Sequence, residues 1–251
     1  MFYSIVNKGK KSLLLVDGGS GLNAERVRRV IDENGGAVEA WFLTHYHEDH
    51  IGAFNELWEQ YKDQIGMVYV TPFDWDTFVE VQHDWDTPEA FSRFLEQTKD
   101  SANIKELFRG TELSIQNIRI KNFNAFDDIV RQYSTDWPND CSLVLKFSFQ
   151  KDSVLFLGDL SRAGIKLGEY LLNTYGAEEL HADYVQGGHH GNWRMPISFY
   201  EAIHPKEFFF DGPEWLMTGE QYDAKDTEAW CKEKGIGTHD YRNAPVSFVL
   251  D

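Results

Sequence analysis

The chain has 251 residues, 42% of them hydrophobic and 26% charged, with 18 Phe, 11 Tyr and 8 Trp. This composition is typical of a globular protein with a sizeable core, and it excludes a disordered chain. The 41 acidic residues outweigh the 24 basic ones, so the net charge of −17 disfavours nucleic acids and anionic membranes, whose charges have the same sign. We therefore expect a small-molecule substrate and neither a nucleic-acid nor a membrane partner.

The cysteine content and the N-terminus bear on the cellular compartment. Cys141 and Cys231 are far apart in the sequence, and we expect them to be free thiols rather than a disulfide framework. The apolar residues 2–6 are too few for a signal peptide, and no apolar run approaches the roughly 20 residues that cross a bilayer. We expect a soluble, cytoplasmic protein.

Strands and helices alternate along the first part of the chain. The sequence predicts strands at 2–6, 12–17, 40–43 and 67–70, with helices at 23–33 and 51–61 between them. This alternation indicates an α/β fold. Residues 73–104 are irregular but rich in aromatic residues, and we interpret them as an inserted helical segment that could overhang a site. Alternatively, these aromatic side chains cover the core or form a homodimer interface.

From residue 112 the pattern changes to closely spaced strands, and helices then return. Strands are predicted at 113–121, 142–149, 153–157, 184–186, 207–210 and 246–250, and helices at 165–175, 197–202 and 220–234. No Pro/Gly-rich linker separates the two halves. We therefore predict one domain over residues 1–251.

A cluster of three histidines and two acids follows the strand at 40–43. In the sequence Thr-His-Tyr-His-Glu-Asp-His of residues 44–50, an extended backbone would put His45, His47 and Asp49 on one side. His50 would turn in beside Asp49 where the next helix begins. One cation can then bind His45 and His47, and a second can bind Asp49 and His50. Imidazole and carboxylate ligands suit Zn, and also Mn or Fe.

Two later segments have the same strand-then-ligand pattern. Asp159 ends the apolar strand 153–157, where a carboxylate can bridge two cations. His189 and His190 follow the strand at 184–186, and adjacent side chains rarely bind one ion, so one of them is expected to coordinate. We favour His189 as the ligand, because it comes first after the strand. His190 is then left to donate a hydrogen bond or a proton to the substrate.

Together these segments resemble the metallo-β-lactamase superfamily. The resemblance rests on His45-x-His47-x-Asp49-His50, Asp159 and His189-His190-Gly191, and it spans roughly residues 12–192. It implies a four-layer αβ/βα sandwich with two divalent metal ions, zinc above all, at one edge between two sheets. It also implies that Asp17 supports the site from behind the ligands.

The sequence departs from the usual family pattern at one position. The common third histidine of the first metal site is missing near residues 130–145, where Asn139-Asp140-Cys141 stands instead. This feature resembles a subgroup that includes phosphorylcholine esterases and the hydrolase-like domain of DNA-uptake channel proteins. The resemblance implies phosphodiester or phosphomonoester chemistry, with water, Asn139 or Asp140 completing the first metal site, where Mn or Fe also becomes plausible.

We therefore predict a binuclear metal-dependent hydrolase that attacks with a metal-bridging hydroxide. Asp49 or Asp159 would hold the nucleophile, and His190 would act on the leaving group. The alternative within enzymes is a hydrolase of lactones or other cyclic esters and amides. A di-iron redox protein is a further class, but such proteins usually need a flavin domain, which is not seen in this chain. A non-catalytic metal-binding protein is the remaining class.

Two further features stay open in the sequence. Trp193 and Arg194 directly follow the histidine pair and could contact the substrate, although a packed Trp beside a solvated Arg fits equally well. His239 lies late in the chain, where the family sometimes recruits a site residue.

Overall fold

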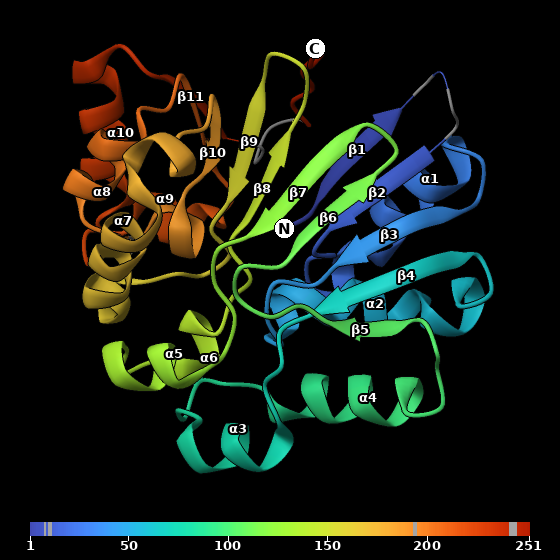
Figure 1. Ribbon diagram of the computed structural model, residues 1–251. Helices are drawn as coiled ribbons and strands as arrows, with labels where there is room; N and C mark the ends of the chain where they lie inside the picture. The colour runs from blue at the N-terminus through green and yellow to red at the C-terminus, as the bar shows by residue number, and fades with distance from the viewer. Residues whose placement is uncertain (8, 10–11, 193–194, 241–244) are drawn as a thin grey trace. The chain divides into compact units, whose positions relative to one another are not determined.

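The two halves of the chain differ in their sheet pairing, and each has its own sheet. The computed structural model describes residues 1–7, 9, 12–192, 195–240 and 245–251 (Figure 1). Contacts between residues divide it into two units, Met1–Leu107 and Phe108–Asp251, called unit 1 and unit 2 below. Each unit consists of one β-sheet and several helices. The predicted α/β fold class is confirmed.

The sheet of unit 1 is parallel except at one edge. Its first pair of strands is antiparallel, and every later neighbour is parallel. Strand β2 has the sequence Ser-Leu-Leu-Leu-Val and is buried at every position, as expected for an inner strand covered on both faces. In sheet order the strands are β1 (Tyr3–Asn7), β2 (Ser12–Val16), β3 (Val38–Phe42), β4 (Ile65–Val70) and β5 (Ile104–Glu106).

Helix α2 (Glu48–Tyr61) is the central helix of unit 1. It contacts α1 (Ala24–Glu33), α4 (Pro88–Thr98) and the short 3-10 helix η1 (Gly21–Asn23). A Cβ atom at Gly52 would lie 2.5 Å from the backbone nitrogen of Gly21, so only glycine allows this close approach. This close packing of Gly52 against Gly21 holds the first turns of α2 in place, and the histidine cluster ends in the first of these turns.

The segment 73–104, where an inserted helical segment is expected, contains α3 (Trp75–Val81) and α4. Most of its aromatic side chains cover the core. Phe78 and Phe91 are buried, and the ring of Phe91 stacks on Tyr46 with centroids 3.9 Å apart. Trp85 is the exception, because 70% of it is exposed in the loop between the helices.

The sheet of unit 2 combines a parallel and an antiparallel half. The strands from β9 to β12 are parallel neighbours, and those from β6 to β9 are antiparallel. In sheet order they are β12 (Gly237–Asp240), β11 (Glu207–Phe210), β10 (Tyr184–Gln186), β9 (Ser153–Phe156), β8 (Leu145–Ser148), β7 (Ile118–Asn122) and β6 (Glu112–Ile115).

Along the chain, the helices of unit 2 lie in the connections between these strands. The α-helices are α5 (Asp128–Tyr133), α6 (Trp137–Asp140), α7 (Ile165–Leu180), α8 (Ile197–Ile203), α9 (Glu214–Thr218) and α10 (Ala224–Lys234). The 3-10 helices are η2 (Arg162–Gly164) and η3 (Gly188–Gly191). None of the helices in the described chain is both long and apolar enough to span a membrane.

Two of the predicted strands are wrong in unit 2. The strand predicted at 113–121 is a hairpin, because Gln116 adopts a left-handed φ of 58° and reverses the chain between β6 and β7. The closing strand predicted at 246–250 is absent, because β12 occupies the sheet position beside β11. The apolar alternation there has another use: the ring of Phe248 packs against Tyr184, with centroids 5.1 Å apart.

Candidate metal centre

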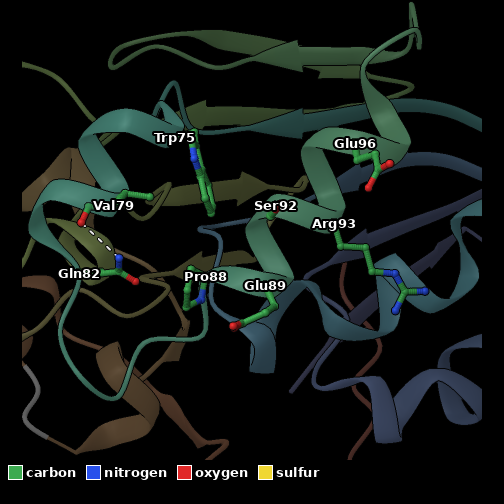
Figure 2. A pocket seen from close by; sticks show the side chains of 8 residues that line it. All are labelled: Trp75, Val79, Gln82, Pro88, Glu89, Ser92, Arg93 and Glu96. Carbon is green, nitrogen blue, oxygen red and sulfur yellow. Dashed lines mark hydrogen bonds between the residues drawn. The ribbon is translucent and has the colours of Figure 1, made fainter.

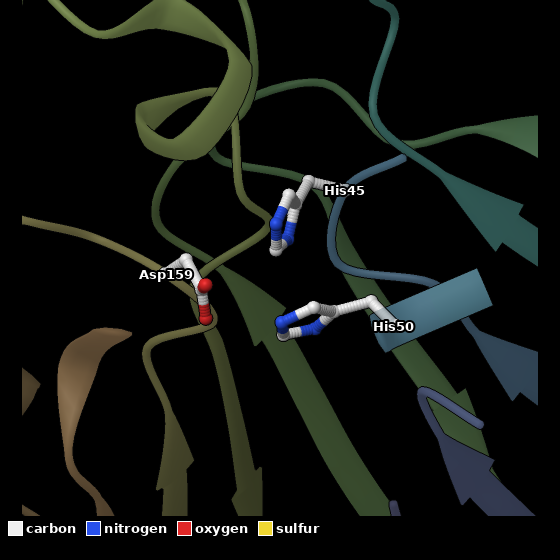
Figure 3. Close-up of side chains that lie close together, drawn as sticks. All are labelled: His45, His50 and Asp159. Carbon is white, nitrogen blue, oxygen red and sulfur yellow. The ribbon is translucent and has the colours of Figure 1, made fainter. Parts of the chain in front are cut away.

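The histidine cluster of unit 1 begins where β3 ends. The backbone stays extended to His47, which has φ −69° and ψ 151° and precedes the first residue of α2. His45 follows β3 in this extended stretch, whereas His50 belongs to the first turn of the helix (Figure 3). Both are fully buried, and their ring centroids lie 4.0 Å apart. The change from extended chain to helix therefore brings two imidazoles together.

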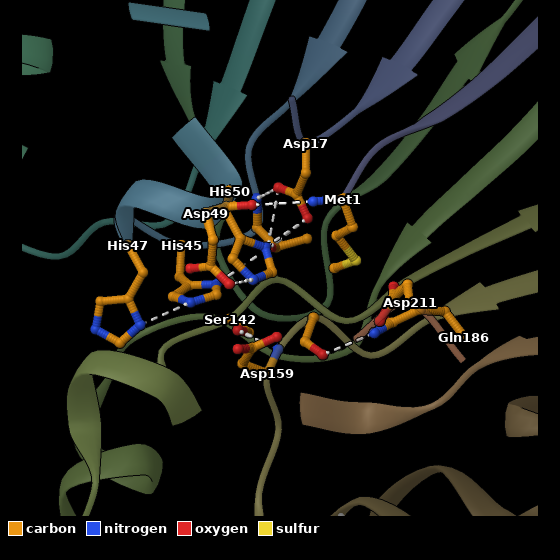
Figure 4. A network of polar contacts seen from close by, with 12 residues as sticks. Met1, Asp17, His45, His47, Asp49, His50, Ser142, Asp159, Gln186 and Asp211 are labelled. Atoms are coloured by element: carbon orange, nitrogen blue, oxygen red, sulfur yellow. Dashed lines mark hydrogen bonds and ion pairs between the residues drawn. The ribbon is translucent and has the colours of Figure 1, made fainter. Parts of the chain in front are cut away.

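Asp17 organises these imidazoles from behind (Figure 4). Its Oδ2 lies 2.9 Å from Nδ1 of His50, and Thr44 donates to Asp17 both from its backbone nitrogen, at 2.8 Å, and from its hydroxyl. Because the Thr44 hydroxyl hydrogen points to Asp17, its oxygen accepts from Nδ1 of His45, 3.1 Å away. Asp17 thus contacts His50 directly and His45 through Thr44, and these contacts favour the Nδ1–H tautomer of both histidines.

His47 faces His45 through its other ring nitrogen. Nδ1 of His47 lies 3.1 Å from Nε2 of His45, and Nε2 of His47 lies 3.1 Å from Oδ1 of Asp86. With a hydrogen on Nε2 of His47 and on Nδ1 of His45, the two facing nitrogens both carry lone pairs. Lone pairs at this distance repel unless a cation or a proton lies between them. Two nitrogens on one tetrahedral zinc are about 3.3 Å apart, so this pair fits a metal.

Asp86 is a site residue that the sequence did not reveal. It lies 39 residues after His47, in the irregular segment between α3 and α4, and its side chain is 1% exposed. Burial acts to raise the pKa of Asp86, but the interactions with His47 and with His83 together outweigh this effect, and the pKa is lowered. The carboxylate is therefore ionised at neutral pH. No local pattern distinguishes it from the other acids of the segment.

Asp49 differs from the histidines in its exposure. Its side chain is 52% exposed, and its Oδ2 lies 3.9 Å from Nε2 of His50. This is too far for a hydrogen bond but suits two ligands of one ion. The predicted pairing of Asp49 with His50 is thus compatible with their positions within unit 1.

In unit 2, Asp159 follows β9 and is almost fully buried (Figure 3). Its backbone nitrogen donates to the Ser142 hydroxyl at 3.0 Å, and that hydroxyl donates to the carbonyl of Asn139 at 2.7 Å. Ser142 therefore connects the end of α6, which contains Asn139, to the loop that carries Asp159. Oδ1 of Asn139 is buried and accepts no hydrogen bond from the described residues, which leaves it as a candidate oxygen donor.

Asp140 has a different environment from Asn139. Its two carboxyl oxygens accept hydrogen bonds from the Ser134 hydroxyl, at 2.5 Å, and from the backbone nitrogen of Ser161, at 2.8 Å. Burial raises the pKa of Asp140 to about 7, against the lowering effect of these bonds. Gly164 leaves room for this carboxyl, because a Cβ there would lie 2.7 Å from Oδ2. Asp140 thus fixes the chain just after Asp159.

The two adjacent histidines adopt a strained backbone, and only His190 is held by a second carboxylate, that of Asp211. His189 and His190 have left-handed φ values of 49° and 63°, which cost non-glycine residues roughly 1 kcal/mol each. Nδ1 of His190 donates to buried Asp211 at 2.9 Å, which leaves its Nε2 lone pair 3.5 Å from Oδ2 of Asp159. Nε2 of His189 is farther from that oxygen, at 3.9 Å.

Asp211 is the second site residue that sequence reasoning missed. It directly follows β11, and Asp159 comes three residues after the end of β9. An acidic residue just after a strand was therefore the sequence signal that could have identified Asp211 as a site residue. An imidazole held by a buried carboxylate is the usual arrangement of a metal-binding histidine.

Two surface clefts lie on unit 1. The larger has a volume of about 520 Å³ and lies between α3 and α4, where Trp75, Pro88 and Arg93 line it (Figure 2). The second has a volume of about 280 Å³ and shares Arg93, whose guanidinium pairs with Glu56. Neither cleft has a candidate metal ligand among its lining residues.

The remaining sequence candidates are placed as follows. Trp193 and Arg194 lie outside the described residues. His239 lies in β12, and its Nε2 is 2.6 Å from Oε2 of Glu207 on the neighbouring strand β11.

Comparison with known proteins identifies the family of the chain. The family model of the metallo-β-lactamase superfamily matches residues 3–193. The structure of CmlA, a diiron β-hydroxylase from Streptomyces venezuelae, is similar with a TM-score of 0.59 and 14% identity, covering 91% of this chain and 49% of CmlA. The chain thus spans about half the length of CmlA.

A metallo-β-lactamase fold protein, YhfI from Bacillus subtilis, has a TM-score of 0.49 and 15% identity, covering 92% of this chain and 85% of that protein. A sequence comparison with curated proteins gave no match. Members of the matched family are typically hydrolases that bind two metal ions. The match covers most of the chain, and the histidine and aspartate groups of both units have the donor chemistry of such sites. The chain therefore belongs to the metallo-β-lactamase superfamily.

Proposed function

We propose that the protein is a binuclear metal-dependent hydrolase that acts on phosphodiesters or phosphomonoesters. The observation that carries the metal-dependent part is the pair of facing nitrogens in unit 1, Nδ1 of His47 and Nε2 of His45, 3.1 Å apart. The contacts of His45 with Thr44 and of His47 with Asp86 favour tautomers whose lone pairs face each other, which suits a cation between them. Membership of the superfamily supports two ions in place of one.

The ligands that we propose come from both units, and their combination rests on family membership. They are His45, His47, Asp49, His50, Asp159 and His190. We assign His190 rather than His189 as the ligand, which reverses the preference based on strand order. The reason is that Asp211 holds Nδ1 of His190, so that Nε2 carries the lone pair, 3.5 Å from Oδ2 of Asp159. Bound divalent cations would supply hydroxide from water near pH 7 and would polarise the substrate oxygen.

The other residues have roles that follow from their contacts. Asp17 and Thr44 hold His45 and His50 in the ligating tautomer. Asp49, half-exposed, would orient the attacking water. His189, with Nε2 still near Asp159, is left to protonate the leaving group.

The phosphoester assignment has weaker support than the metal assignment. It rests on the subgroup resemblance and on Asn139, whose buried Oδ1 offers oxygen where the usual pattern has an imidazole. An oxygen donor at that position favours Mn or Fe more than an imidazole would, while zinc remains the first expectation.

Metal content and substrate profile test the proposal together. Purified protein should contain close to two transition-metal ions per chain, and His47→Ala should lose most of them. The loaded protein should hydrolyse bis-nitrophenyl phosphate or nitrophenyl phosphate faster than a lactone or a β-lactam. Protein without metal after expression in metal-replete medium would contradict the hydrolase proposal.

The same experiment separates the alternatives. Fast lactone turnover with inert phosphoesters would favour the hydrolase of cyclic esters. Bound iron whose visible absorbance responds to reductant, without hydrolysis, would favour a di-iron redox protein. The likeness to CmlA, at 14% identity, bears on the fold alone.

A further inference from the structure

The loop between α3 and α4 contains a buried acid in otherwise exposed surroundings. Asp84 and Trp85 are exposed, whereas the side chain of Asp86 is 1% exposed. A tight turn fixes the carboxylate: the backbone nitrogen of His83 donates to Oδ2 of Asp86 at 2.7 Å, and the backbone nitrogen of Asp86 donates to the His83 carbonyl at 3.0 Å. The loop thus holds one carboxylate in a defined orientation.

The remaining oxygen of Asp86 is directed at His47. Oδ1 lies 3.1 Å from Nε2 of His47, and at this distance the negative charge of the carboxylate favours a hydrogen on that nitrogen. The opposite nitrogen of the same ring, Nδ1, is the one that faces His45. The contacts therefore run from the carboxylate of Asp86 to the imidazole of His47, and from there to the imidazole of His45.

We propose that Asp86 is a positioning residue that fixes His47 in the Nε2–H tautomer and so presents Nδ1 to a metal ion. This inference rests on the proposed function, because it gives His47 a metal to bind. It adds that the α3–α4 loop, through Asp86, controls the affinity of the site. The loop is separated by 39 residues from the histidine that it orients.

A purely structural role explains the pair less well. A buried ionic or polar pair seldom adds stability over an apolar pair of similar size, because both groups lose their hydration. The surrounding segment contributes to the core with aromatic residues such as Phe78 and Phe91, which need no charged neighbour. The Asp86–His47 contact is best explained by what it does to the imidazole, since a carboxylate both sets the tautomer and makes the other nitrogen more basic.

The test compares Asp86→Asn and Asp86→Ala with Asp84→Asn, an exposed acid two residues away that matches the change in charge. In the metal-free protein, the ¹⁵N chemical shifts of the His47 ring report the tautomer. We expect the Nε2–H form in the wild type and in Asp84→Asn, and a mixture of tautomers in Asp86→Ala. The zinc affinity, measured by competition with a chelating dye, should fall about tenfold in Asp86→Asn and up to about a hundredfold in Asp86→Ala.

Cobalt substitution adds a readout that a structural role would not change. The visible spectrum of bound Co²⁺ should shift in Asp86→Ala and not in Asp84→Asn. If the wild type binds two ions and the Asp86 variants keep its tautomer, affinity and spectrum, the role of Asp86 is refuted while the hydrolase proposal stands. If the wild type binds no metal, the hydrolase proposal fails and with it the metal role of Asp86. The tautomer measurement then still decides whether the carboxylate orients His47.

Discussion

His190 and Asp211 form a pair in unit 2 that parallels His47 and Asp86 in unit 1. In both pairs, a buried carboxylate holds one ring nitrogen, so that the other carries the lone pair. The two ligands are nevertheless built differently, because His190 has a left-handed backbone and His47 an extended one. The carboxylate, rather than the backbone, is the feature that they share.

Substitution of Asp211 should weaken metal binding in steps. In Asp211→Asn, the amide oxygen can still accept from Nδ1 of His190, but the negative charge is lost, and we expect an affinity loss of about tenfold. In Asp211→Ala the tautomer is no longer fixed, and the loss should approach a hundredfold. Titration of the metal-free variants with zinc in the presence of a competing dye measures both. An unchanged affinity in Asp211→Ala would show that His190 is not a ligand.

Residue contacts also show the limit of what the sequence predicts. The cluster at 45–50 was readable because its members lie within six residues, and local backbone geometry alone brings them together. Asp86 and Asp211 contact histidines 39 and 21 residues away, so their roles depend on tertiary structure that no local pattern encodes. The choice between His189 and His190 depends on the same long-range contact.

At the level of elements, the start of α5 depends on one acid with two functions. Asp127 accepts hydrogen bonds from the backbone nitrogens of Ile129 and Val130 as the N-cap of α5, and its two carboxylate oxygens accept from Nε and Nη2 of Arg109. Burial acts to raise the pKa of Asp127, but the Arg109 hydrogen bond, the Arg109 charge and the two backbone bonds outweigh it, so the pKa is lowered.

This lowered pKa predicts the sign of a pH dependence. Because the folded pKa lies below the unfolded value of about 3.9, the pair stabilises the protein fully above that pH, and the contribution is lost as the pH falls through the folded pKa. Asp127→Asn should therefore lower the free energy of unfolding at pH 7 by about 1 kcal/mol, since the carboxylate is partly exposed. The deficit relative to the wild type should shrink below pH 4.

Urea unfolding at several pH values measures the effect, and Asp128→Asn is the matched control. Asp128 is the exposed neighbour in the first turn of α5, so its substitution removes the same charge without breaking the Arg109 pair. An Asp127→Asn deficit that grows on acidification would contradict the assignment.

The strand pattern shows where elements were predictable and where they were not. The predicted strands at 184–186 and 207–210 coincide with β10 and β11, because short apolar runs between turn residues leave little ambiguity. The apolar alternation at 246–250 was misleading, since residues such as Phe248 can pack their rings on a sheet without joining it. The alternation indicates neither strand pairing nor burial at this place, because Val246, Phe248 and Val249 are exposed.

For the molecule as a whole, the free energy of metal binding adds to the free energy of folding. Ligands that bind the folded chain alone stabilise it by about 2.7 kcal/mol at a free concentration 100 times the Kd. For a chain of about this length, such a gain corresponds to a rise in melting temperature on the order of 5–10 °C. We therefore expect EDTA to lower the melting temperature of the zinc-loaded protein by that amount, and zinc to restore it.

Differential scanning calorimetry measures this shift, and His47→Ala provides the comparison. The variant lacks one proposed ligand, so the gap between its zinc-loaded and EDTA-treated melting temperatures should be smaller. Equal melting temperatures of the wild type with zinc and with EDTA would count against a metal bound only to the folded state.

The site residues, both the proposed ligands and the acids that hold them, lie just after strands, and this has a consequence for how the sequence can diverge. Asp159, His190 and Asp211 follow three neighbouring parallel strands, β9, β10 and β11, and Asp17 and His45 follow the neighbouring strands β2 and β3. Adjacent strands are spaced about 4.8 Å apart by their backbone hydrogen bonds, whatever side chains they carry. The spacing of the donors is thus inherited from the peptide backbone, and the loops beyond them can be exchanged without disturbing it. Selection or directed evolution can therefore alter the substrate of such a chain while its inorganic chemistry stays the same.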